Sequence, residues 1–77
     1  MSKLIYVVNG SEDGIIGVFG NVKGAYDRAC EYIKGSYTNP EVLTTYSEAL
    51  KSCKSWGAII ESNNDTNATI YTHVLNS

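Results

Sequence analysis

The sequence predicts a small α+β domain in which a β-hairpin at each end of the chain encloses a helical middle. Two apolar, β-branched runs, residues 4–8 and 15–19, flank a turn rich in Gly and Asp. A second pair, residues 58–61 and 68–75, flanks a polar segment. Since 77 residues leave room for one core of modest size, we expect residues 1–77 to form a single domain.

The first hairpin is apolar on both of its faces. Residues 4–8 and 15–19 contain almost no polar side chain to mark a solvent side. We therefore expect one face of the hairpin to cover helices and the other to meet more protein, from this chain or from a partner.

A first helix is predicted over residues 22–34. Asn21 is a suitable N-cap, and Gly35 stands where a left-handed C-terminal residue is favoured. The apolar positions with helical spacing are Val22, Tyr26, Ala29 and Ile33.

Residues 36–57 allow two interpretations. Thr38, Pro40 and Glu41 resemble a helix start. One long helix would then carry a single apolar stripe made of Val42, Tyr46, Ala49, Cys53 and Trp56. Alternatively, residues 42–46 form a short strand and a shorter helix follows. Both interpretations make residues 47–56 helical.

The last strand has two distinct faces, one with Ile70, Thr72 and Val74 and one with Tyr71, His73 and Leu75. The second face is amphipathic, which favours a contact surface. Six Tyr and one Trp also exceed what a small core needs, and such rings are enriched at binding hot spots. We assign Tyr26 and Trp56 to packing. The predicted partner-binding residues are Tyr32, Tyr37, Tyr71, His73 and Leu75.

The loop at residues 17–24 is the alternative candidate site. It places glycines and a lysine between a strand and a helix, where backbone N–H groups can hold an anion. Gly20, Asn21 and Lys23 would form this site, with Lys51 and Lys54 as auxiliary charges. The loop lacks the Gly-Lys-Ser/Thr ending of a P-loop, so a plain turn is the simpler interpretation.

No catalytic or metal-binding motif is evident. His73 is the single imidazole, and Cys30 and Cys53 lack the spacing of zinc ligands. We expect reduced, buried thiols and no cofactor. The net charge of −2 disfavours nucleic-acid binding. The longest apolar runs have five residues, so we expect a cytoplasmic protein without a membrane span.

The segments YVVNGSEDGIIGVFGNVKGAYDRACEYI and TTYSEALKSC, with the terminal strand, resemble the small accessory proteins of large tailed bacteriophages of the T-even-like type. The resemblance implies a non-enzymatic protein of the host cytoplasm that binds and redirects host or antiviral machinery. It supplies no site residues.

Two functions follow as expectations. The first is a binding protein that inhibits or modulates a host or antiviral-defence protein, as an anti-CRISPR-like or host-takeover factor, with a homodimer as a further option. The alternative is an anion, nucleotide or nucleic-acid binding module that uses the loop at residues 17–24 and Lys23.

Overall fold

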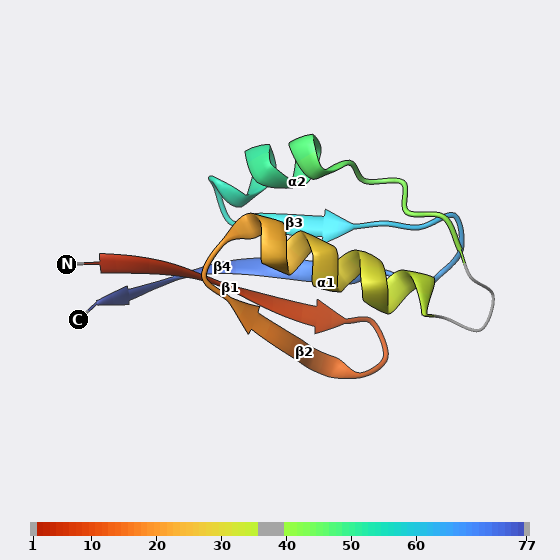
Figure 1. Ribbon diagram of the computed structural model, residues 1–77, viewed down its shortest axis with the longest axis horizontal. Coiled ribbons are helices and arrows are strands. Elements are labelled where there is room, and N and C mark those ends of the chain that lie inside the picture. Colours follow the sequence, from red (N-terminus) through yellow and green to blue (C-terminus); the bar gives the residue numbers. More distant parts are fainter. Residues whose placement is uncertain (1, 36–39, 77) are drawn as a thin grey trace.

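Both helices lie on one face of a four-stranded antiparallel sheet in the computed structural model, which describes residues 2–35 and 40–76 (Figure 1). The predicted α+β domain with a hairpin at each end is confirmed. In chain order the elements are β1 (Ser2–Gly10), β2 (Gly14–Phe19), α1 (Val22–Lys34), α2 (Tyr46–Cys53), β3 (Gly57–Ile60) and β4 (Ala68–Asn76).

The two hairpins join through their long strands. The strand order is β2-β1-β4-β3, and β1 and β4, nine residues each, pair along their whole length from Ser2 opposite Asn76 to Gly10 opposite Ala68. The shorter β2 and β3 cover only the half of this pair nearer the turns. The sheet therefore ends in a two-stranded arm that carries both chain ends (Figure 1).

Helix α1 has the predicted bounds. The Asn21 side chain accepts a hydrogen bond from the Gly24 N–H at 2.7 Å and caps the first turn. The prediction for Gly35 is wrong, because this residue is right-handed with φ −78°. Its N–H bonds to the Glu31 carbonyl at 2.9 Å, so the helix ends on a continued right-handed turn that needs no positive φ.

The long-helix interpretation is wrong, because α2 begins only at Tyr46. Of the strand predicted over residues 42–46 only an isolated bridge at Val42 is present, while the shorter helix of that interpretation does follow. Val42 forms an antiparallel bridge with Ser62. The Leu43 N–H bonds to the Glu61 carbonyl at 2.8 Å. This pairing with the chain after β3 satisfies backbone groups that a helix would have bonded internally. Thr38 lies outside the described residues.

Helix α2 starts after the capping residue Thr45 and ends at Cys53, three residues before the predicted end. Trp56 therefore leaves the apolar stripe, and its predicted packing role is wrong, because 49% of it is exposed. Tyr26 does pack, half-buried, and donates its hydroxyl hydrogen to the Thr44 carbonyl at 2.6 Å. Burial raises the pKa of Tyr26 to about 12, so the hydroxyl stays protonated at neutral pH.

The core between helices and sheet contains few large side chains. The largest that are fully buried are Ile33, Ile60, Ile70 and Val8. Much of the remaining core is alanine, namely Ala25, Ala29, Ala49, Ala58 and Ala68. Small residues allow the helices to approach the sheet closely, but they bury little apolar area for each residue.

Candidate protein-binding surface

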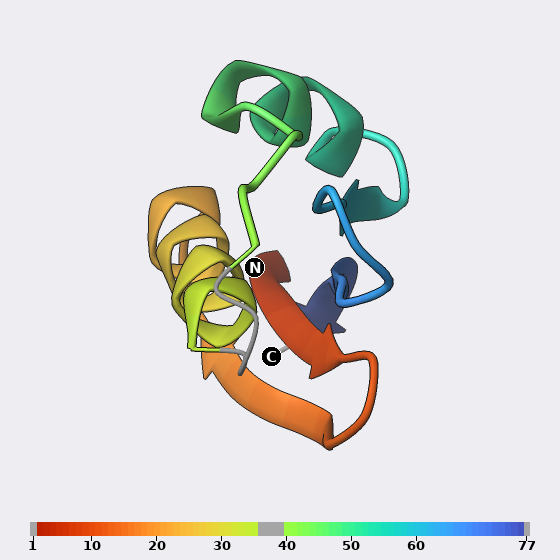
Figure 2. The same cartoon turned by 90° about the vertical axis from the view of Figure 1, so that its right-hand side faces the viewer.

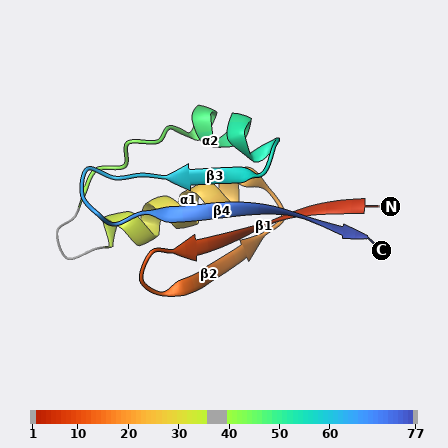
Figure 3. The same ribbon diagram turned by 180° about the vertical axis from the view of Figure 1, so that it is seen from behind.

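The sheet face turned away from α1 and α2 carries no other layer within residues 2–35 and 40–76 (Figure 3). We call it the open face. The strand register assigns eleven side chains to it, because directly paired residues point to the same side. Seven are aliphatic or aromatic, namely Ile5, Val7, Ile15, Val18, Ile59, Tyr71 and Leu75. The other four are Lys3, Asn9, Thr69 and His73.

These side chains form rows across neighbouring strands. Tyr71 of β4 pairs with Val7 of β1, and Val7 pairs with Val18 of β2. On the other side of Tyr71 stands Gly57 of β3, which has no side chain. The row therefore places one aromatic ring next to Val7, with Val18 beyond it on β2.

The open face is apolar and well exposed. Ile15 is 69% exposed, Val18 57% and Leu75 49%. Ile59 and Tyr71 are 46% and 40% exposed. No Asp or Glu occupies a position of β1, β2, β3 or β4 that points to this side. Lys3, opposite Leu75, places one charge at the arm end of the face. The centre of the face carries none, and depletion of charge around aromatic and aliphatic groups is typical of the centre of protein interfaces.

The prediction that three residues share one face of the last strand is confirmed. Tyr71, His73 and Leu75 point to the same side of β4 and lie on the open face, with His73 opposite Ile5. The other apolar members of the face come from β1, β2 and β3. For the members from β1 and β2, the signal in the sequence is the apolar character of both faces of the first hairpin.

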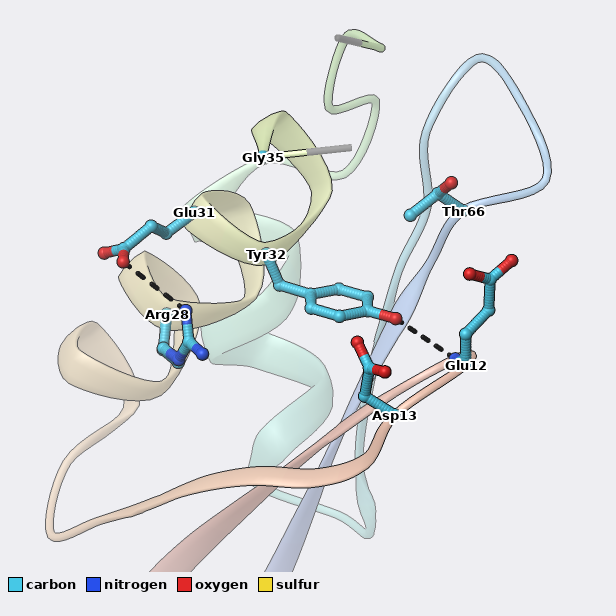
Figure 4. Close-up of a pocket in the computed structure, with 7 residues that line it drawn as sticks. All are labelled: Glu12, Asp13, Arg28, Glu31, Tyr32, Gly35 and Thr66. Atoms are coloured by element: carbon cyan, nitrogen blue, oxygen red, sulfur yellow. Dashed lines mark hydrogen bonds and ion pairs between the residues drawn. The ribbon is translucent and has the colours of Figure 1, made fainter. Parts of the chain in front are cut away.

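Tyr32 does not join this surface. The Tyr32 hydroxyl accepts a hydrogen bond from the Glu12 N–H at 3.1 Å, on the helix side of the sheet (Figure 4). A side chain on Gly10 would come within 2.6 Å of the Tyr32 ring. Tyr32 therefore holds α1 against the β1–β2 turn. Tyr37 lies outside the described residues.

Tyr32 also lines a polar pocket of about 510 Å³ (Figure 4). Glu12, Asp13 and Glu31 surround it, and Arg28 pairs with Glu31 at 3.4 Å. Among the described residues there is no group of three or more His, Cys, Asp or Glu side chains arranged to hold a metal ion.

The residues of the predicted anion loop make contacts with one another and with α1. The Gly24 N–H, one of the donors that an anion would need, bonds to Asn21. The Lys23 ammonium pairs with Asp27 at 3.0 Å and lies 5.6 Å from the centre of the Tyr46 ring. Gly20 is exposed, with nothing within 4 Å of where its Cβ would be. This geometry gives the anion-binding alternative no support.

The thiols and the imidazole are separated. Cys53 is buried on the helix side, where burial raises its thiol pKa, while Cys30 is half-buried on α1. His73 lies on the open face. The three side chains therefore do not converge on one site.

Acidic side chains gather at the loop end of the molecule, which faces the viewer in Figure 2. The Ser11 N–H bonds to the Asn67 carbonyl, so the β1–β2 turn adjoins the β3–β4 loop. The exposed acidic residues of this end are Glu12, Asp13, Glu31, Glu41, Glu61 and Asp65. They come from segments far apart in sequence, so the one-dimensional pattern did not reveal the cluster.

None of the described helices is long and apolar enough to cross a bilayer. Comparisons with family models, curated proteins and solved structures found no match to this chain.

Proposed function

We propose that this chain is a small non-enzymatic binding protein that acts by docking its open face onto another protein. The observation that carries the proposal is the continuous apolar surface of a sheet that has helices on its other side alone. Contiguous exposed apolar patches of a few hundred Å² on small proteins commonly mark interaction sites.

The composition of the open face supports this function. Tyr71 stands between Val7 of β1 and Gly57 of β3 and is 40% exposed, and exposed tyrosines are enriched among binding hot spots. Lys23, predicted for the anion loop, and Tyr32, predicted for partner binding, make contacts within the fold instead.

The target that we propose is a host or antiviral-defence protein in the cytoplasm of a bacterium, which the chain inhibits or modulates. This part of the proposal rests on the resemblance to small accessory proteins of tailed bacteriophages. Such a target would be recognised by an exposed apolar patch that complements the open face.

Site-specific photo-crosslinking tests the proposed surface. A photoreactive amino acid at Val18, on the open face, is compared with one at Val74, which is equally exposed on the opposite side of β4. In bacterial lysate we expect a discrete crosslinked protein from position 18 and none from position 74. Adding Tyr71→Ala should weaken the crosslink without unfolding the chain. Crosslinks from position 74 alone, or no crosslink from either, would contradict the proposal.

A further inference from the structure

We propose that a second copy of this chain covers the open face in the free protein, with the two long axes antiparallel. The inference rests on the proposed function in that it takes the same surface to be a protein-binding surface. It adds that the partner in the free protein is a second copy of the chain, and it adds the orientation in which this copy binds.

The first argument is the distribution of large apolar side chains. Among the described residues four large side chains are fully buried, whereas five of the exposed large apolar side chains, each at least 40% exposed, lie on the open face. A small core with many alanines gains much from covering that face. A second copy is present whenever the chain is present, so it is the one partner that can always provide this cover.

The second argument is area. With strands about 4.8 Å apart and a rise of about 3.3 Å per residue, the four strands span a flat area of roughly 450 Å². The protruding side chains enlarge the accessible area beyond this flat value. Specific, stable interfaces bury about 600–1,000 Å² per partner. The flat area lies below this range, so a dimer needs the protruding side chains and the adjoining β1–β2 turn to supply the rest.

The third argument is charge. The loop end carries six acidic residues and two cations, Arg28 and Lys34, for a net charge of −4. The rest of the chain carries four lysines and two carboxylates, for a net charge of +2, and the two parts add to the net charge of −2. The lysines are Lys3 on the arm, Lys23 at the start of α1, and Lys51 and Lys54 at the end of α2.

This charge distribution selects the orientation of the second copy. The open face runs from a negative end to the arm end, where Lys3 points to the open face opposite Leu75 and the other three lysines lie on the helices behind the sheet. Its electrostatic complement is therefore the same face turned end for end. Two-fold symmetry allows face-to-face packing with the long axes parallel or antiparallel. The antiparallel arrangement places each acidic end over the lysine-bearing end of the other copy, whereas the parallel arrangement places acid over acid.

One functional consequence follows. A foreign target that uses the open face has to displace the second copy, so dimerisation and target binding are mutually exclusive. The dimer thereby shields the apolar surface until a target is available.

Sedimentation equilibrium with the full chain tests the dimer. We expect the wild-type mass to rise toward twice the 8.4 kDa of the monomer as concentration rises through the micromolar range. Val18→Lys should raise the dissociation constant at least about tenfold, since it buries a charge in the interface. Val74→Lys is the matched control, with equal exposure outside the open face, and should leave the constant unchanged.

A wild-type chain that remains monomeric throughout this range overturns the inference. Equal effects of the two lysine variants overturn it as well. Neither result contradicts the proposed function. That proposal has its own test and is contradicted if position 18 gives no crosslink to a foreign protein.

Cysteine crosslinking tests the orientation. Thr69 and Leu75 both point to the open face from β4, near its loop end and its arm end respectively. In a Cys30→Ser background, chains with Thr69→Cys are mixed with chains carrying Leu75→Cys. The antiparallel dimer predicts disulfides that join position 69 to position 75. Disulfides that join 69 to 69 and 75 to 75 would overturn the proposed orientation.

Discussion

Thr45 and Glu48 together determine where α2 begins. The Thr45 hydroxyl oxygen accepts a hydrogen bond from the Glu48 N–H at 3.2 Å, and the Glu48 carboxylate accepts one from the Thr45 N–H at 3.0 Å. The hydrogen bond from the Thr45 backbone is the main reason that the pKa of Glu48 lies below its ordinary value of 4.5. This capping box ends the extended segment and separates it from the helix.

Removing the cap gives a prediction at the residue scale. Thr45→Ala should lower the free energy of unfolding by about 1 kcal/mol at neutral pH. Because the folded pKa of Glu48 is lowered, its contribution is complete above the unfolded pKa and disappears as the pH falls through the folded pKa.

Chemical denaturation between neutral and acidic pH measures both effects. The Glu48→Gln variant should lose less stability than the wild type as the pH falls below 4.5. An identical acid dependence in the two proteins would contradict the assigned role of the carboxylate.

At the scale of elements, Gly57 allows β3 to begin directly after the turn that follows α2. Its φ of +145° is one that other residues rarely adopt, and a Cβ there would run into the Ile70 carbonyl oxygen. The Ser52 hydroxyl donates to the Gly57 carbonyl at 2.6 Å and holds the connection in place.

Gly57→Ala should therefore destabilise the fold by about 3 kcal/mol or more. Gly20→Ala is the control, because nothing lies within 4 Å of its Cβ position and its φ is ordinary. It should change the free energy of unfolding by no more than about 0.5 kcal/mol. Thermal unfolding followed by circular dichroism measures both values, and a small effect of Gly57→Ala would show that the chain relieves the clash.

The sequence predicted the elements better than their long-range arrangement. Both hairpins and the bounds of α1 followed from local patterns, namely β-branched runs and the Asn21 cap. The conformation of residues 42–46 did not follow from local patterns. It depends on backbone pairing with Glu61 and Ser62, and local propensity carries no information about such distant partners. Trp56 was assigned to the core because the helix was expected to extend to residue 56.

Part of the candidate site was predictable because it depends on a local pattern, and the rest was not because it depends on strand pairing. Alternation along β4 placed Tyr71, His73 and Leu75 on one face, as the structure confirms. Their neighbours Val7 and Val18 join them through the pairing of β1 with β4 and with β2. That pairing also brings the turns together and creates the acidic end, which no local pattern indicates.

At the scale of the whole molecule, the two layers leave one side of the sheet uncovered. The helices protect the side with Ile33, Ile60 and Ile70, while Ile15, Val18 and Ile59 stay exposed on the other. Thermal stability should therefore depend on protein concentration, because association that covers the open face stabilises the folded state by mass action. By calorimetry we expect the midpoint temperature of thermal unfolding to rise with protein concentration in the wild type. In Val18→Lys the midpoint temperature should stay constant.

The most direct test of the open face as a protein-binding surface is an isotope-filtered NOE spectrum of a mixture of labelled and unlabelled chains. We predict intermolecular NOEs from the side chains of Val18, Ile59 and Leu75. Val74 on the opposite side of β4 should give none. Intermolecular NOEs confined to Val74 and α2, or their absence at concentrations where the mass is that of a dimer, would contradict this account.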